Sequence, residues 1–186
     1  VGRESHTWIY HIVNNYNNLS KVNIFLQGRI DDLGCMAYQN PNNYLLDIER
    51  SGFCASRYGL LGPFHWKYNV GIENDIRYKE DWENGKITKS SIGFRKFAKN
   101  LFPEIPIFVA TSYGGCFAVK KNKIMQHNKE FYINLLNILE KSRNPIEGHY
   151  MERLWCYIFS KNNLLNHSIK DMIQTKFENL NKIFFT

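Results

Sequence analysis

The sequence predicts an α/β fold in which helices cover a sheet of buried strands. Residues 4–16 place apolar side chains at helical spacing, and the apolar run Val22–Leu26 is typical of a buried strand. Ile105–Ala110 and Cys116–Val119 have the composition of two further buried strands. Because a helix, a turn and a buried strand follow one another at the start, we expect a helix packed on a parallel sheet.

The rest of the chain is mostly helical in pattern, above all its C-terminal third. Helices are predicted over Asn43–Arg50, Ile92–Leu101, Glu130–Lys141, Glu147–Phe159 and Ser168–Ile183. Residues 51–69 are rich in glycine and aromatic residues and show no clear period. With no internal repeat and no linker, residues 1–186 are expected to form one domain, from which an N-terminal segment with the first strand is missing.

Composition indicates a globular protein with an anionic partner. The chain is 44% hydrophobic and 15% aromatic, which is ample for a core at 186 residues. Its net charge of +7 favours a nucleotide diphosphate, a nucleic acid or an acidic lipid surface. The basic residues are scattered, so an extended nucleic-acid footprint is the weaker option.

The sequence also suggests where the protein works. Its longest apolar runs are far shorter than the ~20 residues that a membrane-spanning helix needs. The cysteines are widely spaced and form no Cys-x-x-Cys pair, so reduced, mostly buried thiols are expected at Cys35, Cys54, Cys116 and Cys156. Together these features predict a cytoplasmic protein without a transmembrane segment.

Two loops carry residues suited to a nucleotide. Gly2 leads into a helix N-terminus that favours an anion, where Arg3 is placed to contact a phosphate and Glu4 a sugar hydroxyl; an ordinary capped helix start explains the same residues. Asp31 and Asp32 follow the strand Val22–Leu26 and suit Mg²⁺ or Mn²⁺, which bridges nucleotide phosphates. A solvated acidic turn is the alternative there.

The segment 147–155 carries the third candidate group. At helical spacing, Glu152 falls at the boundary between a polar face with His149 and an apolar face with Trp155. A carboxylate partly desolvated by an indole gains proton affinity, as a general base requires. The alternative is the polar face of a packed structural helix.

Three stretches together resemble a known family. GRESHTWIYHIVNNYNNLSKVNIFLQG at 2–28, TSYGGCFAVKKNKIMQHNKEFYINLLNIL at 111–139 and EGHYMERLWCYIF at 147–159 are similar to an uncharacterised domain-of-unknown-function family of fungi, algae, bacteria and large viruses. Its members often accompany surface-polysaccharide glycosyltransferases, and its layout is similar to that of GT-A glycosyltransferases. The resemblance therefore implies a GT-A-like, Rossmann-like mixed sheet flanked by helices.

The resemblance also implies roles for individual residues. Glu152 stands where an acidic catalytic base often sits, and Asp31 and Asp32 stand where a metal motif lies. The residues implied in donor binding are Gly2, Arg3, Glu4, Gln27 and Gly28. Those implied in acceptor binding are Tyr113, Gly114, Gly115, His149 and Trp155.

These observations lead to a glycosyltransferase as the first hypothesis, with a nucleotide-sugar donor and a surface-polysaccharide or other glycan acceptor. The second hypothesis is a non-catalytic carbohydrate- or protein-binding module on the same fold. It is favoured by the missing first strand and by Leu33, which stands where the family pattern has a histidine. A nucleic-acid binder that depends on the net charge is the third and least favoured.

Overall fold

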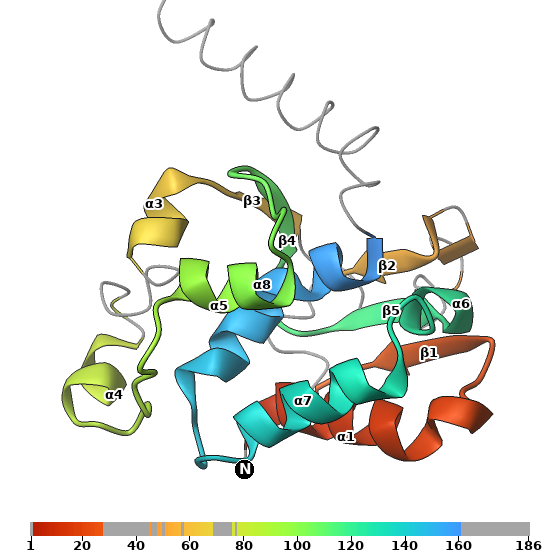
Figure 1. Ribbon diagram of the computed structural model, residues 1–186, viewed down its shortest axis with the longest axis horizontal. Coiled ribbons are helices and arrows are strands. Elements are labelled where there is room, and N and C mark those ends of the chain that lie inside the picture. Colours follow the sequence, from red (N-terminus) through yellow and green to blue (C-terminus); the bar gives the residue numbers. More distant parts are fainter. Residues whose placement is uncertain are drawn as a thin grey trace, which may run out of the picture.

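The computed structural model describes residues 2–27, 45, 48–49, 51–56, 58–68, 76 and 78–160. Within these residues the chain forms a mixed α/β fold of small antiparallel sheets and surrounding helices (Figure 1). The α/β class is thereby confirmed. The helix predicted over Ser168–Ile183, and most of the one over Asn43–Arg50, lie outside the described residues.

A three-stranded sheet lies at the centre. Its strands are β1 (Val22–Phe25), β5 (Phe117–Lys120) and β2 (Phe53–Ala55), in the order β1-β5-β2. Both neighbours run antiparallel to β5, with Phe25 opposite Phe117 and Cys54 opposite Ala118. The expected parallel pairing is therefore absent from the described strands. Although β1 and β2 run in the same direction, β5 separates them.

The second sheet pairs β3 (Tyr58–Leu61) with β4 (Val109–Ser112). All four residues of β4 are buried, as predicted for this run, but the strand begins later than the predicted start at Ile105. Pro106 has no amide hydrogen to donate to a ladder. The residues Ile107 and Phe108 after it are 51% and 57% exposed, so this part of the run lies on the surface.

Helices surround both sheets. α1 (Arg3–Asn15), α7 (Lys129–Leu139) and α8 (Ile146–Ser160) confirm the predicted helices at both ends of the described chain. The 3₁₀ turn η1 (Tyr16–Asn18) follows α1. α1 packs against α7 and α8, and α8 also packs against β4. The shorter helices are α3 (Pro63–Lys67), α4 (Lys79–Glu83), α5 (Phe94–Leu101) and α6 (Lys121–Ile124).

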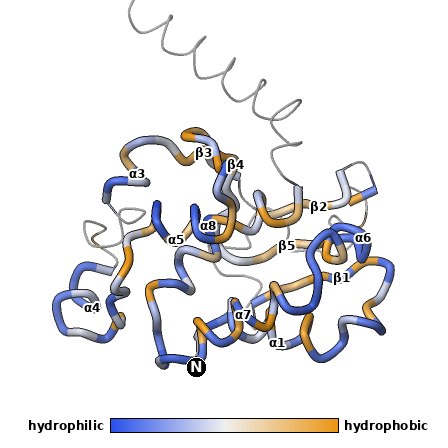
Figure 2. The backbone as a smooth tube through the Cα atoms, viewed as in Figure 1, coloured by the Kyte–Doolittle hydropathy of each residue, from blue (hydrophilic) through white to orange (hydrophobic). Residues whose placement is uncertain are grey.

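An aromatic cluster centred on Phe117 joins the sheet to α1 and α8. The Phe117 ring is fully buried, and its centroid lies 5.5 Å from that of Trp8 and 5.3 Å from that of Trp155. Phe25 and Phe53 approach the same ring from the two neighbouring strands. Figure 2 shows hydrophobic residues along these central elements and hydrophilic residues over α4.

The cysteines follow the sequence expectation only in part. Cys54 and Cys156 are free and buried, and burial raises the pKa of the Cys156 thiol. Cys116 is disulfide-bonded, so the expectation of a reduced thiol is wrong at this position. Across the part of the chain that the structure describes, no helix has the length and apolar character needed to span a bilayer.

The turn before β5 provides a test of how tightly the core is packed. Gly115 has a φ of +67°, and a Cβ at this position would lie 2.6 Å from the Trp8 ring. For Gly115→Ala, we expect about 1–2 kcal/mol of backbone strain plus about 1–3 kcal/mol of overpacking. Urea denaturation should therefore show a loss of about 2–5 kcal/mol.

Gly85→Ala is the matched control for that measurement. Gly85 has nearly the same φ, +68°, but a Cβ at this position would meet no atom within 4 Å. The free energy of unfolding of Gly85→Ala should therefore fall only by the backbone strain of about 1–2 kcal/mol. Equal losses in the two variants would show that Trp8 does not pack tightly on the turn.

Candidate functional site

The first half of α8 carries most of the polar side chains of the candidate site. His149 and Arg153 are buried although both are polar, and Glu152 lies between them with a side chain that is 21% exposed. The helix is fixed against β4, because Thr111 Oγ1 donates a hydrogen bond to the Arg153 carbonyl oxygen at 2.8 Å. These side chains therefore start from a rigid backbone.

The glycine turn between β4 and β5 binds the Glu152 carboxylate. The backbone amide of Gly114 donates to Glu152 Oε1 at 2.7 Å. Gly114 has a φ of +79°, a left-handed conformation that glycine adopts without strain and that the predicted sharp bend requires. The structure thus brings together Gly114 and Glu152, which the sequence had connected only through the family resemblance.

Arg153 is the second partner of this carboxylate. Its Nη1 atom lies 2.6 Å from Glu152 Oε2, and its side chain is 7% exposed. The contact pairs opposite charges but lacks hydrogen-bond geometry, since Nη1 has no hydrogen-bond partner among the described residues. The guanidinium also lies 5.1 Å from the centre of the Tyr113 ring, within the range of a cation–π interaction.

The start of α1 docks on the start of α8. Arg3 Nη1 donates to His149 Nε2 at 2.9 Å, and Ser5 Oγ donates to the Gly148 carbonyl oxygen at 3.1 Å. The Gly2 amide donates to the Ser142 carbonyl oxygen in the loop between α7 and α8. Residues from opposite ends of the described chain are therefore neighbours in the fold.

Two arginines help to keep His149 neutral. Burial lowers its pKa to about 3, and the charges of Arg3 and Arg153 add to this effect. Since an arginine can only donate, Nε2 is the acceptor and the proton of the neutral ring is on Nδ1. The ring also packs edge-on against Tyr78, with 5.1 Å between the ring centroids. The pKa of His65 is also lowered, mainly by burial and in addition by the charge of Arg153.

The N-terminus of α1 keeps the features that suit an anion. No side chain caps it, and the Arg3 side chain is 37% exposed while it contacts His149. Glu4 Oε2 lies 3.7 Å from Arg3 Nε, which makes a weak ion pair. Arg3 also has a φ of 56°, which is uncommon for a residue other than glycine and is typical of functional or tightly determined backbone.

Gln27 is half-buried and follows the end of β1. Because Phe25 pairs with Phe117, the antiparallel register carries this end of β1 toward the turn at Gly114. Gly28, Asp31 and Asp32 lie outside the described residues, so their predicted roles stay predictions. Among the residues that the structure does describe, no cluster of three His, Cys, Asp or Glu side chains is arranged to hold a metal ion.

Two of the predicted acceptor residues serve the core. Trp155 is fully buried and stacks on Phe159 with 5.8 Å between ring centroids. Gly115 lies against Trp8 and makes room for its indole. Neither residue presents a surface to a glycan here, whereas Tyr113 and Gly114 contact Arg153 and Glu152.

Sequence reasoning missed Arg153 and Tyr78 as members of this group. The signal for Arg153 was its place in a helix with 12 buried residues, where a charge needs a partner. In the sequence pattern, Arg153 had a place only in the alternative interpretation, with Glu152 on the polar face of a packed helix. Tyr78 stands beyond a stretch without clear periodicity, and no local pattern connects it with His149.

Comparison with protein families identifies the group to which the molecule is related. A family model described as "Protein of unknown function (DUF3431)" matches residues 1–173. The chain belongs to the DUF3431 family. The resemblance based on the motifs at 2–28, 111–139 and 147–159 is thereby confirmed. Neither the curated proteins nor the solved structures contain a match.

The buried state of His149 in this DUF3431 chain predicts a pH dependence of stability. Its pKa is lower when folded than in the unfolded chain, so the unfolded state takes up the proton first. Stability is therefore retained above about pH 6.5 and falls as the pH drops from there toward the folded pKa of about 3. Between pH 7 and pH 5 the expected loss from this residue is about 1–2 kcal/mol.

Urea denaturation of the wild type and His149→Gln at pH 7 and pH 5 measures this contribution. Glutamine keeps an acceptor for Arg3 but does not titrate. The variant should therefore show a smaller loss at pH 5, while the other titrating groups are common to both proteins. An equal pH dependence in the two proteins would mean that His149 is protonated as easily when folded as when unfolded.

Proposed function

We propose that this protein is a glycosyltransferase that transfers a sugar from a nucleotide-sugar donor to a hydroxyl group of a glycan, on a GT-A-like variant of the α/β fold. One observation carries the proposal: the start of α1, the glycine turn before β5 and the first half of α8 meet in one polar group. Arg3 reaches His149 at 2.9 Å, and Gly114 reaches Glu152 at 2.7 Å. The description of the DUF3431 family names no activity.

The basic groups suit the diphosphate of the donor. The uncapped N-terminus of α1 offers backbone amides and the positive end of a helix dipole. Arg3 adds a guanidinium that suits bidentate phosphate contacts, and its contact with His149 holds it beside α8. In this proposal Asp31 and Asp32 would hold Mg²⁺ or Mn²⁺, which would supply positive charge to the phosphates.

Glu152 is the proposed general base. The Gly114 amide and the Arg153 guanidinium orient its two oxygens, and the side chain remains partly exposed. In the transfer, the bond between the anomeric carbon and the diphosphate oxygen breaks and a bond to the acceptor oxygen forms. The acceptor proton passes to Glu152, and the nucleoside diphosphate leaves.

A non-catalytic binding module is the second candidate, and one observation favours it. Both oxygens of Glu152 already have partners, an arrangement that also suits a residue whose task is to hold α8 against the glycine turn.

The cytoplasmic location of the protein also stays a prediction. The disulfide at Cys116 counts against it, because such bonds are typical of oxidising compartments.

Glu152→Gln distinguishes the two candidates. For an enzyme, nucleotide-sugar hydrolysis or transfer should fall by about 10²–10⁴-fold, while donor binding in isothermal titration with Mn²⁺ changes little. Glu147→Gln is the matched control, since Glu147 lies on the same helix but outside the polar group. A wild type that binds a sugar or glycan without turning over any donor is a binding module.

Arg3→Ala tests the donor site separately. If Arg3 contacts the diphosphate, its loss should weaken binding of UDP- or GDP-sugars about tenfold or more, since charge-assisted hydrogen bonds are worth about 1.5–3 kcal/mol. The measurement is titration with each donor in the presence and absence of Mn²⁺. No heat with any donor in the wild type would rule out the proposed transferase.

A further inference from the structure

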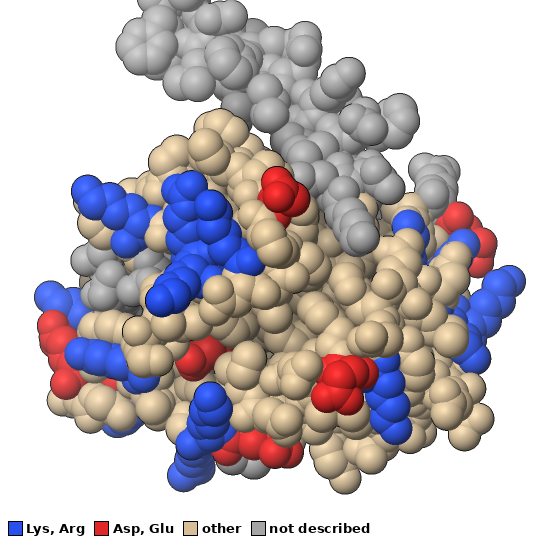
Figure 3. Space-filling model, viewed as in Figure 1, with Lys and Arg blue, Asp and Glu red and all other residues tan. Residues whose placement is uncertain are grey.

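A second surface, separate from the polar group on α8, combines basic and apolar side chains. We name it the basic-apolar face, and its members are Arg95, Lys96, Lys99, Ile107 and Phe108. The three basic residues are exposed on α5, whose Phe94 and Phe97 face the core. Figure 3 shows Lys and Arg side chains gathered over this part of the molecule.

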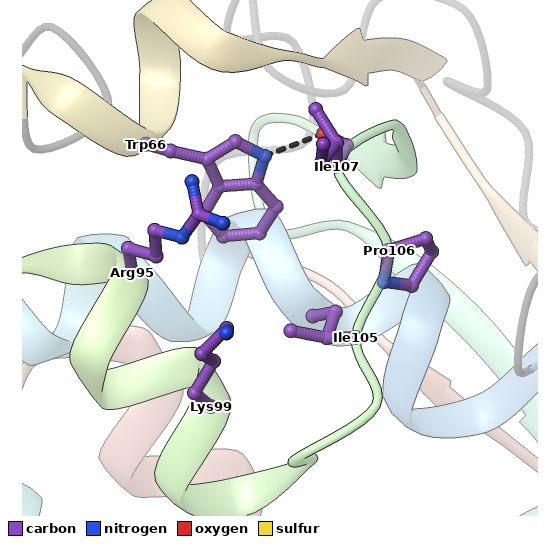
Figure 4. Close-up of a pocket in the computed structure, with 6 residues that line it drawn as sticks. All are labelled: Trp66, Arg95, Lys99, Ile105, Pro106 and Ile107. Carbon is purple, nitrogen blue, oxygen red and sulfur yellow. Dashed lines mark hydrogen bonds between the residues drawn. The ribbon is translucent and has the colours of Figure 1, made fainter.

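The basic and apolar members border the same shallow hollow. Arg95 and Lys99 extend from α5 toward the Trp66 ring and Ile105, with Pro106 and Ile107 on the opposite wall (Figure 4). The Trp66 indole donates to the Ile107 carbonyl oxygen at 2.5 Å, which fixes this wall to α3. Phe108 covers Gly62 just before α3.

The charges of this face have no acidic partner among the described residues. None of the three basic side chains forms an ion pair there, in contrast to Lys79, Lys86 and Lys120 elsewhere on the surface. Glu104 precedes the hollow in sequence, but its charge acts on Tyr157, whose pKa is raised by burial and by this carboxylate. The face therefore offers net positive charge next to exposed apolar side chains.

The shape of the face limits what can bind. The hollow has a cavity volume of about 10 Å³ and opens to solvent, which is far smaller than the roughly 300–1,000 Å³ of small-molecule sites. Trp66 is buried and stacked on Phe94, so it offers no free ring for a sugar or a base. Ile107 and Phe108 are instead each more than half exposed to solvent.

From these features we propose that the basic-apolar face binds the surface of a membrane that contains anionic lipids. Exposed apolar side chains enter the boundary between headgroups and acyl chains, and neighbouring basic side chains bind the anionic headgroups. The proposal does not depend on the transferase activity, because it uses none of the residues of the polar group on α8.

Sedimentation with vesicles tests the proposal. The protein should bind vesicles of phosphatidylcholine with phosphatidylserine, and bind vesicles of phosphatidylcholine alone at least tenfold more weakly. Each basic residue near an anionic surface contributes about fivefold in binding, so Arg95→Gln with Lys99→Gln should weaken binding more than tenfold. Lys141→Gln with Arg143→Gln removes the same charge from the loop after α7 and should change binding little.

A second pair of variants tests the apolar part. Ile107→Ser should weaken vesicle binding several-fold, whereas Met125→Ser, at an exposed methionine after α6, should not. Thermal unfolding checks that all variants are folded. Absence of vesicle binding, or equal losses in the α5 and loop variants, would overturn the proposal. Binding to heparin or single-stranded nucleic acid without binding to vesicles would also overturn it, in favour of a soluble polyanion.

Discussion

The packing of α8 on the Phe117 ring is the constraint on which the candidate site depends. Trp155 contacts this ring from α8, and Trp8 contacts it from α1, so both helices are placed relative to β5 by the same side chain. Gly115 allows Trp8 to lie against the turn. The neighbouring Gly114 then faces Glu152, because the turn and the helix share one aromatic support.

The arrangement joins three distant parts of the sequence through backbone groups as much as side chains. The start of α1 contacts the Ser142 and Gly148 carbonyl oxygens, and β4 contacts the Arg153 carbonyl oxygen. Such contacts fix helix positions without using the side chains that face the site. Arg3, Glu152 and Tyr113 thereby keep part of their surface for other partners.

The local patterns predicted the helices α1, α5, α7 and α8 and the strands β1 and β5 well, because 3.6-residue periodicity and short apolar runs are set by neighbours in sequence. Strand direction was not accessible: nothing in Val22–Leu26 records that β5 runs opposite to it. β2 and β3 have three and four residues and lie in a glycine-rich stretch, so no period could emerge. Within the site, Glu152 was found from its helical position, but the burial of Arg153 depends on β4 and Tyr113.

The pairing of Glu152 with Arg153 has a consequence for engineering. An ion pair withdrawn from water contributes little to net stability, and apolar side chains of similar volume often do as well or better. Selection of this protein for heat resistance alone would therefore favour replacing the pair. Such a thermostable descendant would keep its aromatic interior while losing the anchored carboxylate, so screens for robustness should be run together with a ligand-binding readout.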